Sequence, residues 1–212
     1  MDSRTHTIET WDKVADLYQT KFMDVEAYNH GYDTFCKLLQ AEGATVFEIG
    51  CGPGNITRQL LSRRPDIAIT ATDVAPSMVQ LTKVNNPSAD CLVMDSKDIL
   101  NITPGFHGIV CGFCIPYLSK EESIKLVSDC SQLLNKDGLL YLSFIEGDYD
   151  KSGFETSSCG RYHMFVYYHS EDFIRQCFRD NGFEVLHFER LVFERPGKPA
   201  SSELIWIAQK SK

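Results

Sequence analysis

Apolar residues recur near the start of the chain with the spacing of amphipathic helices. Between Thr7 and Phe22, and again between Glu26 and Gln40, they return every three or four residues. Both segments precede the first predicted strand, so we expect two helices that cap one side of a sheet. Their apolar faces consist of Trp11, Val14, Ala15, Tyr18 and Phe22 in the first helix, and Tyr28, Tyr32, Phe35, Leu38 and Leu39 in the second.

The middle of the chain alternates short apolar runs with helical patterns. Pro76 opens one helix, at a position where proline is tolerated. Ser119 caps another, with Glu122 at the reciprocal position of a capping box. Strands that alternate with helices indicate an α/β fold with helices on both faces of a sheet. The strands are predicted at residues 45–49, 67–72, 91–94, 108–113 and 139–145, with a turn at 135–138.

The last third of the chain has a different pattern. A polar loop is predicted at residues 148–160, and Ser170 caps a helix that ends at Asn181. Strands follow at 183–194 and 204–208, joined by a proline- and glycine-rich turn at 195–199. Because so short a connection cannot cross over, these two strands must pair antiparallel.

Three glycines follow the first predicted strand at every second position, namely Gly50, Gly52 and Gly54. A strand, a glycine turn and a helix form the geometry that binds nucleotide-like ligands in open α/β sheets. A dinucleotide-binding loop requires glycine at position 55, where this chain has Asn55. The spacing therefore argues against a nicotinamide-linked dehydrogenase.

The segment from Glu48 to Gly54, which reads Glu-x-Gly-x-Gly-x-Gly, resembles the first motif of class I S-adenosylmethionine (AdoMet) dependent methyltransferases. The resemblance extends from about Thr45 to Gln209. It implies a Rossmann-like, seven-stranded, mostly parallel sheet with a C-terminal antiparallel hairpin and an N-terminal helical cap. It also implies AdoMet as methyl donor and S-adenosylhomocysteine (SAH) as product. We expect one domain over residues 1–212, with the cap in 1–42, the AdoMet-binding core in 43–145 and the substrate side in 146–212.

The resemblance also assigns cofactor contacts. Asp73 ends the second predicted strand, where a carboxylate can accept both ribose hydroxyls. Asp95 is expected at the adenine amino group, with Asp98 as a nearby rival, and Glu48 is expected to act through water or the loop backbone. Tyr18 either closes over AdoMet or is a core tyrosine. The residues predicted to bind the cofactor are Tyr18, Glu48, Gly50, Cys51, Gly52, Gly54, Asn55, Asp73, Val74, Met78, Asp95, Ser96, Cys111 and Gly112.

Residues for the methyl acceptor are harder to assign. The segment Cys114–Tyr117 lacks the leading Asn or Asp and the first proline of the motif in enzymes that methylate exocyclic amines. The aromatic segment 161–169 either forms the wall of a pocket or is a half-buried strand before a helix. It contains His163, the candidate general base. The candidate substrate contacts are Tyr28, Tyr117, Glu146 and Tyr162.

Metal and redox sites are not expected. Glu146 and Asp148 stand where catechol-type methyltransferases bind a metal, but the other acids of such a site are not evident, so we predict no metal. The chain has eight scattered cysteines, which is typical of buried free thiols in a reducing compartment.

Charge and hydropathy limit the partners. With 21 basic and 29 acidic residues the net charge is −8, which disfavours a nucleic-acid substrate. No apolar run of membrane-spanning length and no signal-peptide core are evident, so we expect a cytoplasmic protein without a membrane partner. The leading hypothesis is an AdoMet-dependent methyltransferase that acts on a small molecule. The alternative is a non-catalytic AdoMet-binding module or partner subunit. Neither the acceptor atom nor the oligomeric state is predicted.

Overall fold

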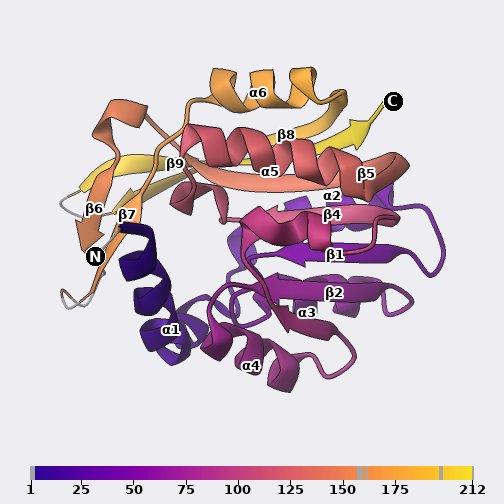
Figure 1. The fold of residues 1–212 in the computed structure, drawn as a ribbon, viewed down its shortest axis with the longest axis horizontal. Coiled ribbons are helices and arrows are strands. Elements are labelled where there is room, and N and C mark those ends of the chain that lie inside the picture. The colour runs from indigo at the N-terminus through magenta and orange to yellow at the C-terminus, as the bar shows by residue number, and fades with distance from the viewer. Residues whose placement is uncertain (1–2, 157–159, 161, 196–197, 212) are drawn as a thin grey trace.

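A single mixed sheet organises the chain in the computed structural model, which describes residues 3–156, 160, 162–195 and 198–211. Its strands are β1 (Thr45–Ile49), β2 (Ala68–Asp73), β3 (Asp90–Val93), β4 (Phe106–Gly112), β5 (Leu134–Glu146), β8 (Phe183–Arg195) and β9 (Lys198–Lys210). They lie in the order β3-β2-β1-β4-β5-β9-β8 (Figure 1). The first five pair in parallel, and β9 is antiparallel to both β5 and β8. The predicted fold class and the terminal antiparallel hairpin are confirmed.

Helices cover both faces of this sheet. One face carries α2 (Asn29–Leu38), α3 (Asn55–Arg63) and α4 (Pro76–Asn85), and the other carries α5 (Lys120–Leu133) and α6 (Glu171–Asp180). Successive strand residues point to opposite faces, so Val46 packs on the α2–α3 side and Phe47 on the α5–α6 side. The same alternation separates Tyr141 from Leu140. Burial on both faces explains why these strands read as nearly continuous apolar runs.

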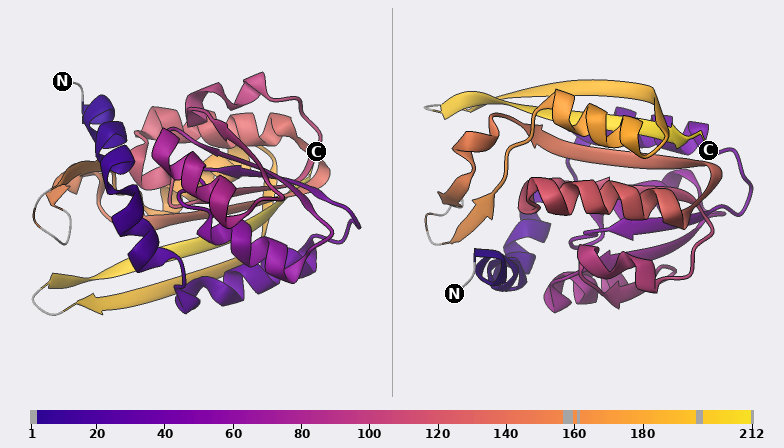
Figure 2. Two further views of the ribbon diagram at one scale, coloured as in Figure 1. Left: turned by 90° about the horizontal axis from the view of Figure 1, so that it is seen from below. Right: turned by 45° about the horizontal axis from the view of Figure 1, so that its top comes forward.

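A helix and a separate two-stranded hairpin lie at the edge of the sheet where the parallel strands end. Helix α1 (Ser3–Phe22) contacts α4 and β7 (His163–Val166), which pairs with β6 (Gly153–Thr156) in a separate hairpin (Figure 2). The four short 3-10 helices are η1 (Glu26–Tyr28), η2 (Ser96–Asn101), η3 (Ile115–Tyr117) and η4 (Tyr149–Lys151). Helix α1 therefore lies over the carboxyl ends of the strands, the edge at which open α/β sheets bind ligands.

Several predicted boundaries were wrong. The polar segment 148–160 contains η4 and β6, because pairing with β7 stabilises a strand that its own sequence does not favour; residues 157–159 lie outside the described chain. Helix α1 begins at Ser3 and not at Thr7, and β9 begins at Lys198, six residues before the prediction. Within the predicted turn 195–199, Pro196 and Gly197 lie outside the described residues.

The predicted turn at residues 135–138 is a bulge inside β5. Leu134 already pairs with Phe106, whereas Leu139 pairs with Gly108, so β5 carries extra residues opposite a short stretch of β4. Asp137 takes up the bend with a φ of 61°. The prediction that these residues turn the chain was wrong, because the chain continues in the same strand direction through the bulge.

Candidate functional site

A cavity of about 360 Å³ lies at the carboxyl ends of the parallel strands, beneath α1. Its volume is within the usual range for sites that bind small molecules and cofactors. The strand ends, the loops after them, α1 and the segment after β7 all contribute to its lining. Of the residues predicted from sequence, the cavity is lined by Tyr18, Gly50, Gly52, Asn55, Asp73, Val74, Met78, Asp95, Ser96, Gly112 and Tyr117.

The three loop glycines are required for three different reasons. Gly50 has a φ of 71°, and its N–H donates to the Thr72 carbonyl at 2.8 Å, which anchors the loop on β2. Gly52 has a φ of 56°, which strains any other residue, and a Cβ there would have no contact closer than 3.7 Å, to Tyr18, so it would occupy cavity space. A Cβ on Gly54 would lie 2.2 Å from the Asn86 side chain, so this glycine lets α3 begin against α4.

Asp73 joins the glycine loop to the end of β2. Its Oδ2 accepts from the Gly52 N–H and its Oδ1 from the Ala75 N–H, both at 2.9 Å. Burial raises the pKa of Asp73, and these backbone hydrogen bonds partly offset the shift. A carboxylate oxygen can accept more than one hydrogen bond, so this side chain can still receive two neighbouring hydroxyls of a sugar.

Glu48 lies beneath the loop and does not line the cavity. The Thr57 hydroxyl donates to its Oε2 at 2.6 Å, and burial raises the pKa of Glu48 to about 8. The carboxyl group is therefore mostly protonated at neutral pH. Its predicted action on AdoMet through water or the loop backbone stays a prediction.

Three other predicted cofactor residues, Cys51, Gly54 and Cys111, lie behind the cavity wall. The Cys51 thiol is 3.4 Å from the Thr82 hydroxyl, which donates to the Gly52 carbonyl at 2.7 Å. Cys111 is fully buried in the core of the sheet, and Gly54 packs against α4. None of the three is among the residues that line the cavity.

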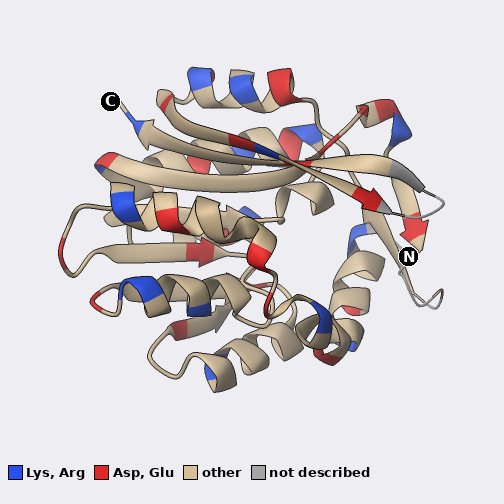
Figure 3. Ribbon diagram, turned by 180° about the vertical axis from the view of Figure 1, so that it is seen from behind, with Lys and Arg blue, Asp and Glu red and all other residues tan. Residues whose placement is uncertain are grey.

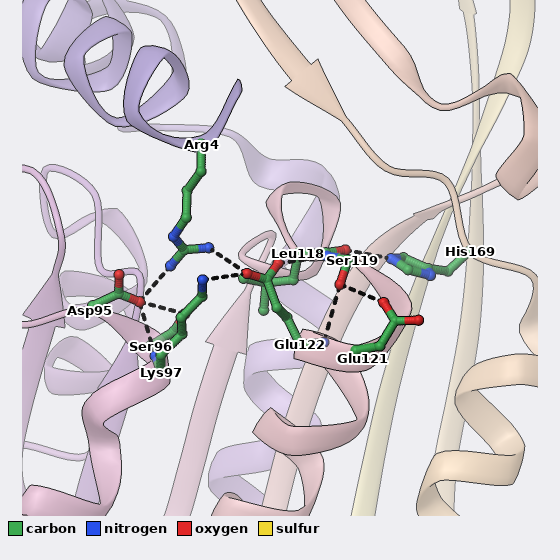
Figure 4. A network of polar contacts seen from close by, with 9 residues as sticks. All are labelled: Arg4, Asp95, Ser96, Lys97, Leu118, Ser119, Glu121, Glu122 and His169. Atoms are coloured by element: carbon green, nitrogen blue, oxygen red, sulfur yellow. Dashed lines mark hydrogen bonds and ion pairs between the residues drawn. The ribbon is translucent and has the colours of Figure 1, made fainter. Parts of the chain in front are cut away.

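An ion-pair network closes one end of the cavity (Figure 4). The Arg4 guanidinium contacts Asp95 Oδ1 at 2.5 Å and Glu122 Oε1 at 3.3 Å, and Lys97 Nζ lies 2.5 Å from the same Glu122 oxygen. Burial raises the pKa of Asp95. Hydrogen bonds from Arg4 and from the Lys97 N–H lower it by more, so the pKa lies below its ordinary value. Because Glu122 also completes the capping box with Ser119, the network ties the start of α1 to η2 and α5.

Aromatic side chains form another part of the cavity wall. The Trp11 ring meets Tyr18 and Tyr117 edge-on, with centroid distances of 5.2 Å to each. Burial, followed by the charge of Asp73, raises the pKa of Tyr18 to about 12, and burial raises the pKa of Tyr117 even more strongly. Both phenols are hydrogen-bond donors at neutral pH, and neither can serve as a general base.

The remaining candidates lie away from the cavity. His163 is exposed on β7, with its ring nitrogen 3.2 Å from the Thr156 hydroxyl. Tyr28 donates to Glu203 at 2.7 Å and packs on Phe113, which itself lines the cavity. Glu146 accepts from Arg190 at 3.2 Å, and Tyr162 is half-buried. None of the four predicted residues is among those that line the cavity.

Several cavity residues were not predicted. The sequence analysis placed Trp11 on an apolar helix face, gave no role to Arg4 or Lys97, and assigned Glu122 only to the capping box of a helix. Arg4, Lys97 and Glu122 meet only through the tertiary fold. The signal for Trp11 was its position seven residues, about two helical turns, before Tyr18 on the same helix face. The aromatic segment did contain two residues that line the cavity, Phe165 and Tyr167.

Comparison with known proteins finds similarity to methyltransferases. Residues 46–138 match a family model described as a methyltransferase domain. A protein of Invertebrate iridescent virus 6, 235L, described as a candidate methyltransferase, is 30% identical over 125 residues, 58% of this chain and 45% of its own. The tRNA N(3)-methylcytidine methyltransferase trm141 of Schizosaccharomyces pombe is 21% identical over 159 residues, 70% of this chain and 64% of its own. The chain thus covers less than two thirds of the length of these two relatives.

Among solved structures, the magnesium protoporphyrin IX methyltransferase ChlM of Synechocystis PCC 6803 with bound SAH has the same fold. Its TM-score is 0.74 at 16% identity, and the match covers 99% of this chain and 100% of that one. The strand order and the glycine loop agree with this domain match, and the fold is the one that the sequence motif resembles.

Proposed function

We propose that the protein transfers a methyl group from AdoMet to a small-molecule acceptor. The observation that carries this proposal is a cavity whose lining includes both the carboxylates of Asp73 and Asp95 and the aromatic side chains of Trp11 and Tyr117. A cofactor with a polar nucleoside half fits beside the carboxylates, and an acceptor fits beside aromatic side chains.

The proposed contacts of the cavity residues cover the nucleoside part of AdoMet. Asp73 would accept from the ribose hydroxyls, Val74 and Met78 would flank the adenine, and Asp95 would accept from its amino group. The cavity side of Gly52 leaves room for the ligand to approach the backbone. When bound, AdoMet supplies a methyl group already activated on a sulfonium centre.

The chain's part in the reaction is to align the acceptor and exclude water. Effective molarities of roughly 10⁵–10⁸ M show how much acceleration alignment alone can provide. Among the described residues that line the cavity there is no histidine, and burial keeps Tyr18 and Tyr117 protonated at neutral pH by raising the pKa of each phenol. We therefore expect an acceptor whose nucleophile does not need a strong protein base.

A small acceptor fits this surface better than an RNA does. The net charge is −8. Figure 3, which views the molecule from behind, shows acidic and basic residues interspersed along its helices and strands. Helix α1 also covers the strand ends, which narrows access to the cavity. Because one relative is named as a tRNA methyltransferase, tRNA belongs in the assay as a competing acceptor.

We also propose a cytoplasmic location. All seven cysteines in the described part of the chain are free and six of them are buried, as expected in a reducing compartment. No helix in the described residues has the length and apolar character needed to cross a bilayer.

The test is transfer of a labelled methyl group from AdoMet to a panel of small acceptors and to bulk tRNA. Transfer to a small acceptor, lost in Gly52→Val, supports the proposal. Transfer to tRNA alone contradicts the acceptor class. Tight AdoMet binding with no transfer to any acceptor of the panel favours the non-catalytic module.

A further inference from the structure

Two histidines and a glutamate meet on the outer face of the molecule, outside the cavity. His187 and Glu189 stand two residues apart on β8, so their side chains share one face of the strand. His30 approaches them from the first turn of α2. Its Nδ1 lies 3.3 Å from Glu189 Oε2, and His187 Nε2 lies 3.8 Å from the same oxygen. The three ligand atoms all lie within 4.8 Å of one another.

The buried position of the His187 Nε2 atom distinguishes this cluster from an ordinary surface ion pair. Its Nε2 is buried, and no group in the described part of the chain makes a hydrogen bond to it. A buried polar atom without a partner is costly, so its position calls for a ligand. The backbone irregularity between Val185 and His187 also changes the pairing register at this point of β8.

We propose that His30, His187 and Glu189 bind a divalent transition-metal ion of the zinc class. Two imidazoles and one carboxylate form a donor set typical of zinc, whose bonds to nitrogen and oxygen are about 2.0–2.2 Å long. Ligand atoms on the edge of such a tetrahedron are about 3.3–3.5 Å apart, so small side-chain movements would close the site. The His30 side chain is 67% exposed, so the fourth position faces solvent and is open to water.

The metal would join the helical cap to the edge of the sheet. Tyr28, two residues before His30, donates to Glu203 on β9 and packs against Phe113, a residue of the cavity wall. Fixing His30 on β8 would therefore hold Tyr28 against this wall. The cluster is separate from Glu146 and Asp148, on which the expectation of no metal was based, and it takes no part in methyl transfer.

The experiment uses the full chain without an affinity tag, freed of metal with a chelator and titrated with Co²⁺, which reports its ligands by visible absorption. The variants are His30→Ala, His187→Ala and Glu189→Gln. His6→Ala, a histidine on α1 that packs on Phe154, is the matched control. We expect saturation at one equivalent in the wild type and the control, and at least tenfold weaker binding in each of the three variants.

Two results would overturn the proposal. One is equal affinity in the wild type and the three variants. The other is a strong thiolate-to-cobalt band in the near ultraviolet, which would assign the ion to cysteines. Because His30 is mostly exposed, its replacement leaves the fold intact and keeps the test valid if His187→Ala does not fold. Zn²⁺ should also raise the Tm of the wild type and of His6→Ala, and not that of His30→Ala.

Discussion

Asp73 offers the sharpest test of the cofactor site, through the substitution Asp73→Asn. The amide keeps the size of the side chain but replaces one accepting oxygen with a donor. That oxygen accepts either from the Gly52 N–H or from the Ala75 N–H, each at 2.9 Å, and we assign its further acceptor capacity to a ribose hydroxyl. Losing one hydrogen bond to a charged group costs about 1.5–3 kcal/mol. The Kd for SAH should therefore rise about 10- to 150-fold, since each 1.4 kcal/mol is tenfold.

Isothermal titration calorimetry with SAH measures this change directly. The matched control is Asp90→Asn, an exposed acid at the start of β3 that does not line the cavity. The control should bind SAH as the wild type does. Circular dichroism and Tm show whether Asp73→Asn is folded, because a lost backbone hydrogen bond can also lower stability by about 1–3 kcal/mol. A folded Asp73→Asn protein with an unchanged Kd would refute the assignment of the ribose to this carboxylate.

Three further predictions follow from the loop, the buried acid and the ion-pair network. Gly52→Ala should lower the Tm by only a few degrees, because of its left-handed backbone at a φ of 56°, and should lose SAH affinity. Gly54→Ala should lose more stability, because its φ is 86° and its Cβ would also lie 2.2 Å from Asn86. Similar Tm values in the two variants would contradict the packing argument. The pKa of Glu48 is raised from 4.5 to about 8, so the stability it contributes is fully present below pH 4.5 and is lost as the pH rises toward 8. Urea unfolding should show that the free energy of unfolding declines less between pH 5.5 and 7.5 in Glu48→Gln than in wild type. Equal declines would reject the raised pKa of Glu48. Arg4→Gln should lower the free energy of unfolding by no more than about 1 kcal/mol, because its ion pairs are partly exposed. It should also speed SAH release in a stopped-flow experiment, and an unchanged release rate would mean that the network does not retain the ligand.

Local sequence patterns were enough to predict the first strand and its glycine loop, whereas the seven-stranded sheet was predicted from the resemblance to a known family. The β1 strand was predicted at its observed bounds, because Thr45–Ile49 is a short apolar run that ends at a glycine. The capping box of Ser119 and Glu122 marked the start of α5 in the same way. In these segments the structure is determined by neighbours in sequence, namely side-chain periodicity, caps and turn residues.

Contacts between distant residues explain what was missed. The β6 strand has little strand preference of its own and exists because it pairs with β7. Arg4 reaches Asp95 across 91 positions in the sequence, so no local pattern could have joined them. His163 was selected for its chemistry alone, and the fold places it on the exposed side of a hairpin. Residue type and spacing identify the loop that binds a cofactor, but they do not show which side chains from other elements complete the cavity.

The account rests on one ligand site, and a thermal-shift titration with SAH, with NAD measured in parallel, tests it most directly. At about 100 times its Kd a ligand adds about 2.7 kcal/mol to stability, and each kcal/mol raises the Tm by about 2–4 °C for a domain of this size. We predict a rise of about 5–11 °C with SAH and none with NAD. A rise with NAD and none with SAH would contradict the assignment of this cavity to AdoMet.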